Sequence, residues 1–263
     1  MRAYNLSFIT DENLFYHVKE TVEKWRLENN LEAFNKNLID PIKLTFDSKL
    51  YGISMEDAID NEARRQIDKS NNNLIGYLQQ NIFKYIHNKD SKKINWSVPK
   101  KGFDIINEVD KIYVEMKNKH NTMNSGSSST VYSKMEKKII EDSKSQCYLV
   151  EIIAKDSQNI PWERITGRGK NKKITSNERI RQISIDKFYE IVTGEKEAFK
   201  QLVEALPKVV DDVLKEIPQN GIQNNVVKEY KNKHGNIENL ESLYLLSFKK
   251  YEGFDNLNMQ NIL

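Results

Sequence analysis

The sequence contains few of the residues that build disulfide frameworks or cysteine-based metal sites. Its 263 residues include one cysteine and four histidines. A single cysteine excludes an intramolecular disulfide and a cysteine-rich zinc site, and it fits a reducing compartment. Cys147 lies in the apolar run Cys-Tyr-Leu-Val, so we expect a small buried side chain rather than a reactive thiol.

Long apolar runs are also missing. No stretch approaches the roughly 20 apolar residues that a membrane-spanning helix needs. The N-terminal segment lacks the apolar block and small-residue cleavage site of a signal peptide. We therefore expect a cytoplasmic protein.

Positive and negative charges nearly balance over the whole chain, but the positive charges are concentrated in one segment. The chain has 41 Lys and Arg against 38 Asp and Glu, a net charge of +3, which by itself does not indicate a nucleic-acid partner. Between Arg164 and Arg181, however, seven cations face one acid, Glu178. Such a segment can neutralise DNA phosphates, and arginine can read guanine through O6 and N7. We expect DNA contacts here, with a solvated basic loop as the alternative, from Arg164, Arg168, Lys170, Lys172, Lys173, Arg179 and Arg181.

Two carboxylates and a lysine form the candidate catalytic group. Residues 112–117 have the aromatic and β-branched composition of a strand, so a period of two places Glu115 and Lys117 on one face. Residues 103–107 are predicted to be the preceding strand. A short hairpin loop pairs positions whose numbers sum to 219, which places Asp104 opposite Glu115.

Paired carboxylates at this spacing indicate a metal-dependent phosphodiesterase. Like charges on facing strands repel unless a proton or a cation lies between them. Mg²⁺ prefers hard oxygen ligands, and Lys117 could orient or deprotonate the attacking water and offset charge that develops on the phosphate. The alternative is the solvated face of an ordinary hairpin, where Glu115 and Lys117 form a weak surface pair.

A polar segment follows the candidate catalytic strand. The residues 120–130, HNTMNSGSSST, have the composition of a mobile loop, and a helix is predicted over 131–141. Such a loop could become ordered on DNA and contact phosphates or bases. The candidate DNA contacts are His120, Asn121, Asn124 and Ser127, and the alternative is a plain linker.

The string FDIINEVDKIYVEMKNKHNTMN, followed after a helical segment by CYLVEIIA, resembles a known catalytic region. It is similar to type II restriction endonucleases of the PD-(D/E)xK superfamily, and most similar to the family that cleaves GGNCC or GGWCC sites. The resemblance extends over most of residues 5–205. It implies that Asp104 and Glu115 are metal ligands and that Lys117 is the catalytic lysine. Phe103 stands where the superfamily name has proline, a position that varies widely.

The same resemblance suggests one more catalytic residue. Many superfamily members carry an acidic residue on the first core helix that reaches the metal, and we nominate Glu62 for this role. The alternative is a solvated helix carboxylate.

The expected fold class is α/β, a mixed central β-sheet flanked by helices, with additional helical N- and C-terminal parts. We expect one nuclease domain over 1–263, with a core at about 54–194, a helical region at 1–53 and a helical extension at 195–263. Helices are predicted from Thr10 to about residue 29, from Ser54 to His87 with an interruption at 70–73, and over 195–217. A strand is predicted over 182–192.

The residues and the resemblance together predict a Mg²⁺-dependent type II restriction endonuclease that cuts double-stranded DNA at a palindromic GGNCC-like site. A two-fold symmetric site is most simply read by a homodimer. The alternatives are a sequence-specific DNA-binding protein on a nuclease-like fold without catalysis, and a structure-specific repair nuclease.

Overall fold

The computed structural model describes residues 2–167, 172–218 and 221–234, together with Tyr244, Ser247, Phe248, Lys250 and Tyr251. The chain divides into two compact units, Met1–Lys24 with Ile75–Ile217 and Trp25–Leu74 with Pro218–Leu263. Whether both units act as one nuclease domain stays a prediction. In the part of the chain that the structure describes, no helix is long and apolar enough to cross a membrane.

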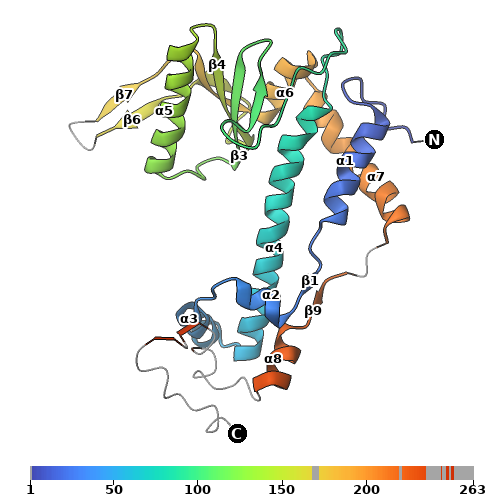
Figure 1. Cartoon of the computed structure of the whole chain (residues 1–263), viewed down its shortest axis with the longest axis vertical. Helices are drawn as coiled ribbons and strands as arrows, with labels where there is room; N and C mark the ends of the chain where they lie inside the picture. Colours follow the sequence, from blue (N-terminus) through green and yellow to red (C-terminus); the bar gives the residue numbers. More distant parts are fainter. Residues whose placement is uncertain are drawn as a thin grey trace. The chain divides into compact units, whose positions relative to one another are not determined.

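The first unit is built on a five-stranded mixed sheet (Figure 1). In spatial order its strands are β2 (Ile105–Asn107), β3 (Ile112–Lys119), β4 (Gln146–Ile153), β8 (Ile180–Ser184) and β5 (Asn159–Pro161). The central strands β3, β4 and β8 run parallel, and the edge strands pair antiparallel to their neighbours. With helices packed against this sheet, the predicted fold class is confirmed.

One face of the sheet packs against α5 (Ser125–Glu141). The helix contributes Tyr132, Met135 and Ile139, which lie three and four residues apart and so share one helix face. They meet Cys147 and Leu149, which alternate along β4 and therefore share one face of the sheet. Cys147 is fully buried, as expected, and burial raises the pKa of its thiol to about 12.

The opposite face packs against α6 (Ile185–Thr193), which stands where most of the predicted strand 182–192 was expected. That prediction was wrong beyond Ser184. The β-branched and aromatic composition favours a strand, but Ile185, Phe188 and Val192 recur at helical spacing and are all buried. Burial of one helical stripe against β4 and β8 therefore outweighed the local propensity.

Two further helices complete the first unit. Thr10 caps α1 (Asp11–Glu23), as predicted, and its side chain accepts a hydrogen bond from the Asn13 N–H. The helix α7 (Ala198–Glu216) lies within the predicted range 195–217 and packs against α1. The strands β6 (Arg164–Thr166) and β7 (Lys173–Thr175) form a separate antiparallel ribbon that extends past α5 (Figure 1).

The second unit is mainly helical. It contains α2 (Leu31–Lys36), α3 (Pro41–Tyr51), α8 (Val226–His234), the short parallel pair β1 (Glu28–Asn29) and β9 (Gln223–Asn224), and most of α4 (Met55–Asn81). A 3₁₀ turn, η1 (Ile82–Lys84), follows α4 in the first unit.

The helix α4 is continuous, so the predicted interruption at 70–73 was wrong. The polar residues there are compatible with a helix because one of them is used for packing. Asn71 is buried, and its side-chain amide exchanges two hydrogen bonds of 2.9 Å with the backbone of Arg26. A polar side chain that is satisfied by another segment no longer competes with its own helix.

Candidate active site

The hairpin formed by β2 and β3 has the predicted register. Ile105 pairs with Val114 and Asn107 pairs with Ile112, so the paired numbers sum to 219. Asp104 directly precedes β2, and its backbone N–H donates to the Val114 carbonyl at 2.9 Å. The observed strand is therefore shorter than the predicted 103–107, but Asp104 remains attached to the β3 backbone.

The turn of this hairpin lacks glycine and is stabilised by side chains instead. The Asn107 amide donates to the Asp110 carboxylate at 2.7 Å, and the Asp110 N–H donates back to the Asn107 side-chain oxygen at 3.0 Å. Asn and Asp favour such local bonds, which replace a backbone turn hydrogen bond. Lys111 takes the left-handed conformation, with φ of 56°, at the end of the turn.

Glu115 is the most enclosed charged group of the hairpin, with 9% of its surface exposed. The Lys117 ammonium donates to its Oε1 at 2.7 Å, which confirms that both residues share one face of β3. A second ammonium, that of Lys134 on α5, donates to Oε2. Burial raises the pKa of Glu115, but the two ammonium groups outweigh it, so the net pKa is below the ordinary value.

Asp104 lies in the same electrostatic group. Its Oδ2 accepts a hydrogen bond from the Met116 backbone N–H at 2.7 Å. Burial raises the pKa of Asp104, and the Glu115 carboxylate raises it further, against the Met116 N–H and the ammonium groups of Lys117 and Lys134. The two carboxylates therefore have pKa values displaced in opposite directions, as is common for paired acids in active sites.

The sequence analysis missed Lys134. Besides Glu115, its ammonium donates to the Gly102 carbonyl at 3.2 Å and lies 4.5 Å from the centre of the Phe103 ring. The residue stands beside the buried stripe of α5, where a long basic side chain can reach past the helix edge. No sequence pattern predicts which strand this edge of α5 covers. Only the packing of α5 on the sheet could therefore identify Lys134 as a partner of Glu115.

The start of α5 differs from the prediction. Residues 125–130 were expected in a mobile loop, but they form the first turns of the helix. Asn124 caps it, since its side-chain oxygen accepts the Ser127 N–H at 2.8 Å. This cap satisfies a backbone donor that the helix itself leaves free, so the Gly- and Ser-rich segment can be helical.

A second polar group lies next to the hairpin on β4. Glu151 pairs in register with Lys117 and is only 4% exposed. Gln182 on β8 donates to its Oε1 at 2.9 Å, and His120 Nδ1 lies 3.1 Å from both carboxylate oxygens. These four residues line part of a cavity of about 140 Å³.

These side chains occupy the carboxyl ends of the parallel strands, on the face that α5 covers. Along β4, apolar Cys147 and Leu149 are followed on the same face by Glu151. Along β3, Tyr113 is followed by Glu115 and Lys117. The face thus changes from apolar to charged toward the carboxyl edge, where ligands of open α/β sheets commonly bind.

The predicted DNA-binding residues lie on several elements of the first unit. Asn121 is exposed, with φ of 55°, directly after His120. Lys172 and Lys173 are exposed at the start of the β7 strand. Arg168 and Lys170 lie outside the described residues.

The remaining arginines of the basic segment bind protein groups in this structure. Arg164 donates to Glu136 at 2.9 Å and to Ser129 at 3.0 Å, both on α5. Arg179 donates to the backbone carbonyl of Ser143, and Arg181 donates to the Asn159 side chain at 2.6 Å. Their role in reading DNA stays a prediction.

Glu62, nominated as a further catalytic residue, lies in the second unit. It is 7% exposed, and two nitrogens of the Arg65 guanidinium donate to its two oxygens at 2.6 Å each. Whether Glu62 acts in catalysis also stays a prediction.

The donor set suits a hard cation with few protein ligands. Among the described residues, no group of three or more His, Cys, Asp or Glu side chains could hold a metal ion. Asp104 and Glu115 offer two carboxylates, and Mg²⁺ is usually bound by one or two carboxylates with water and substrate phosphate oxygens completing its shell. The residues present therefore fit such an ion.

Comparison with known proteins identifies the family of the chain. Residues 6–215 match the family model described as Eco47II restriction endonuclease. This chain belongs to the Eco47II restriction endonuclease family. Its curated relatives include the type II restriction enzyme Sau96I of Staphylococcus aureus, which is 32% identical over 214 residues, 79% of this chain and 80% of that protein. Another is the type II restriction enzyme Eco47II of Escherichia coli, 29% identical over 219 residues, 80% of this chain and 89% of that protein.

As a member of the Eco47II family, the chain is a type II restriction endonuclease, which confirms the resemblance inferred from the sequence. The matched residues include the β2–β3 hairpin and α5, so Asp104, Glu115, Lys117 and Lys134 all lie inside the family region.

Proposed function

We propose that this restriction endonuclease hydrolyses phosphodiester bonds of double-stranded DNA with Mg²⁺, at a palindromic GGNCC-like site, through the hairpin site of the first unit. The observation that carries the proposal is the Glu115 carboxylate, buried beside Asp104 and held by two lysines. Type II restriction enzymes generally need a divalent metal, and this donor set suits one.

In this proposal Asp104 and Glu115 would hold the ion, which would supply Lewis-acid activation of the phosphate and of the attacking water. Asp104 is already oriented, because the Met116 N–H fixes its Oδ2 at 2.7 Å. Such a fixed carboxylate needs little reorganisation when its ligand arrives.

Lys117 would act on the attacking water and on the phosphate. Its side chain is 27% exposed, and its ammonium lies 2.7 Å from Glu115 Oε1, so it is both anchored and accessible. From there it can orient the water for direct attack without a covalent enzyme intermediate, and can offset negative charge on the phosphate in the transition state.

DNA binding by His120, Asn121, Asn124, Ser127 and the basic segment is part of the proposal. The β6–β7 ribbon is the supporting feature, because Lys173 is exposed on it and exposed Lys172 directly precedes it. Contacts of this kind would give an affinity that falls with salt. A homodimer would match a two-fold symmetric site, one subunit cutting each strand, and a cytoplasmic location stays a prediction.

A plasmid assay tests the proposed function. The purified protein is incubated with plasmid and Mg²⁺, and in parallel with EDTA, and the ends of the fragments are sequenced. Discrete fragments with GGNCC-like ends, formed only with Mg²⁺, are expected. Binding without cutting would instead favour a non-catalytic DNA-binding protein, and cleavage confined to junctions or ends would favour a repair nuclease.

Two variants connect the activity to the site. Glu115→Gln and Lys117→Ala are each expected to lower the cleavage rate by roughly 10³-fold while DNA binding is retained, as for the loss of a charge-stabilising group. Glu163→Gln is the matched control, because Glu163 is an exposed glutamate outside the hairpin. If both site variants cut DNA at the wild-type rate, the site assignment is wrong even though the family assignment stands.

A further inference from the structure

A cationic groove lies on the second unit, and none of its lining residues has so far been assigned to DNA. It has a volume of about 530 Å³ and is formed by the end of α2, the residues that follow it and the middle of α4. Four of its lining residues are cations and none is acidic. These cations are Arg26, Lys36, Arg65 and Lys69.

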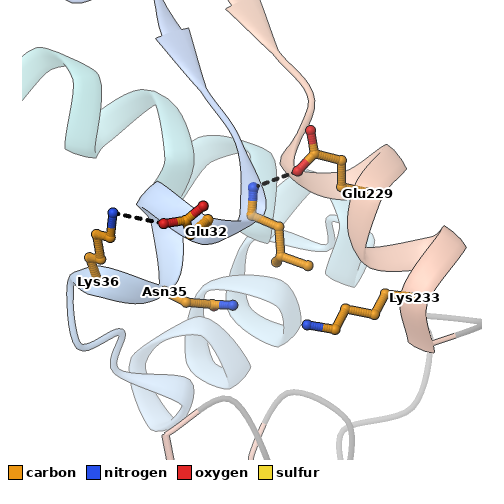
Figure 2. A pocket seen from close by; sticks show the side chains of 6 residues that line it. Glu32, Asn35, Lys36, Glu229 and Lys233 are labelled. Carbon is orange, nitrogen blue, oxygen red and sulfur yellow. Dashed lines mark hydrogen bonds and ion pairs between the residues drawn. The ribbon is translucent and has the colours of Figure 1, made fainter.

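A neighbouring pocket of the same unit is lined by both acidic and basic side chains (Figure 2). That pocket, of about 470 Å³, is lined by Glu32 and Glu229 as well as by Lys36 and Lys233. Its carboxylates are engaged within the unit, since Glu32 pairs with Lys36 at 2.9 Å and Glu229 accepts the Leu31 N–H at 2.9 Å. Opposite charges cancel there. The cationic groove has no acidic residue in its lining, although two of its cations, Lys36 and Arg65, pair with carboxylates outside that lining.

The cations of the groove are held to different degrees. Arg65 donates two hydrogen bonds to the carboxylate of Glu62, which is only 7% exposed. These bonds fix the direction of the guanidinium. Within the described part of the chain, Lys69 is exposed and makes no ion pair with an acidic side chain. Lys69 therefore keeps its full charge available for a ligand.

The spacing along α4 suits an extended polyanion. Arg65, Lys69 and Asn73 are four residues apart, so they follow one face of the helix in steps of about 6 Å. Ser70 and Asn37 add neutral hydrogen-bonding groups to the same lining. A row of donors with this repeat can contact about every second phosphate of a nucleic-acid strand, which carries one charge per 3.4 Å of axis.

We propose that the cationic groove binds the phosphodiester backbone of duplex DNA, and that the second unit therefore contributes to DNA affinity independently of the hairpin site. This inference rests on the proposed function, because it assumes that duplex DNA is the substrate. Glu62 would then act as a positioning residue that directs Arg65 into the groove.

Binding measurements without chemistry test the groove. The full chain in EDTA is titrated against a labelled duplex of about two helical turns by fluorescence anisotropy at several salt concentrations. Lys69→Gln is expected to weaken binding roughly 8-fold at 0.1 M salt and to reduce the slope of log K against log salt by about 0.9, the value for one lost phosphate contact. Lys69→Arg should restore both quantities.

Arg64→Gln is the matched control. Arg64 is exposed on the same helix, pairs with Asp60 at 2.8 Å and does not line the groove. It removes the same charge, so a general electrostatic effect would weaken binding equally in both variants. Arg65 is a poorer choice, because its removal leaves the buried Glu62 without its ion pair and could disturb folding.

Three outcomes would overturn the proposal. They are a wild-type salt slope in Lys69→Gln, an equal loss in Arg64→Gln, and a loss restricted to a GGNCC duplex without a change in slope. The failure of the groove is distinguishable from that of the proposed function, since the first leaves metal-dependent cutting by the wild type intact. If the wild type binds no duplex at all, both proposals fail.

Discussion

Lys117 of β3 and Lys134 of α5 bind different oxygens of one carboxylate, that of Glu115. One lysine comes from the same strand and the other from a helix that begins ten residues after Glu115. Both oxygens that could coordinate a cation are thus already occupied by ammonium groups. A metal ion that binds Glu115 must compete with at least one of them, and the packing of α5 decides how strongly.

Lys134→Met is expected to change the metal requirement of cleavage. Removing its ammonium frees Glu115 Oε2 and removes one positive charge beside the proposed metal site, so the Mg²⁺ concentration for half-maximal cleavage should fall about tenfold. The measurement is a Mg²⁺ titration of the initial cleavage rate. Lys137→Met is the control, because Lys137 is 80% exposed on the same helix. An unchanged titration would show that Lys134 is only a structural partner of the hairpin.

The pH dependence of stability should have opposite signs at the two carboxylates. The pKa of Glu115 is lowered in the folded protein, so its contribution to stability is present above its unfolded pKa and is lost as the pH falls through the folded value. The pKa of Asp104 is raised, so its contribution is present below its unfolded pKa and is lost as the pH rises through the folded value.

In EDTA at neutral pH, Asp104→Asn should therefore raise the free energy of unfolding, whereas Glu115→Gln should lower it. Urea unfolding of both variants at pH 4 and pH 7.5 measures this difference. Two variants that shift stability in the same direction at neutral pH would contradict the assignment.

Asn124 allows capping to be separated from DNA binding. Its side-chain oxygen accepts the Ser127 N–H, so Asn124→Ala should destabilise the protein by about 1 kcal/mol. Asn124→Asp keeps an acceptor for the same bond and should retain stability, but it places a negative charge where a DNA phosphate contact is predicted. Thermal unfolding and duplex binding are measured for both variants. Loss of affinity in Asn124→Asp at wild-type stability supports the contact, and unchanged affinity contradicts it.

The local part of the site was accessible from the residue order alone. Glu115 and Lys117 share a face because alternate residues of a strand point the same way, and the register of the hairpin followed from two adjacent strands and a short turn. The mixed sheet also followed from the order of helices and strands. The two hairpin features depend on residues that are close together in the chain.

The remaining features of the site and fold depend on packing between segments that are distant in the sequence. Lys134 reaches Glu115 because α5 lies on that face of the sheet, and Glu151 lies beside Lys117 because β4 pairs with β3 across 34 residues of sequence. The segment 185–193 became a helix, against its strand propensity, because its buried stripe packs on β4 and β8. A free energy of burial summed over distant elements outweighs local preferences, and it is visible only in the assembled fold.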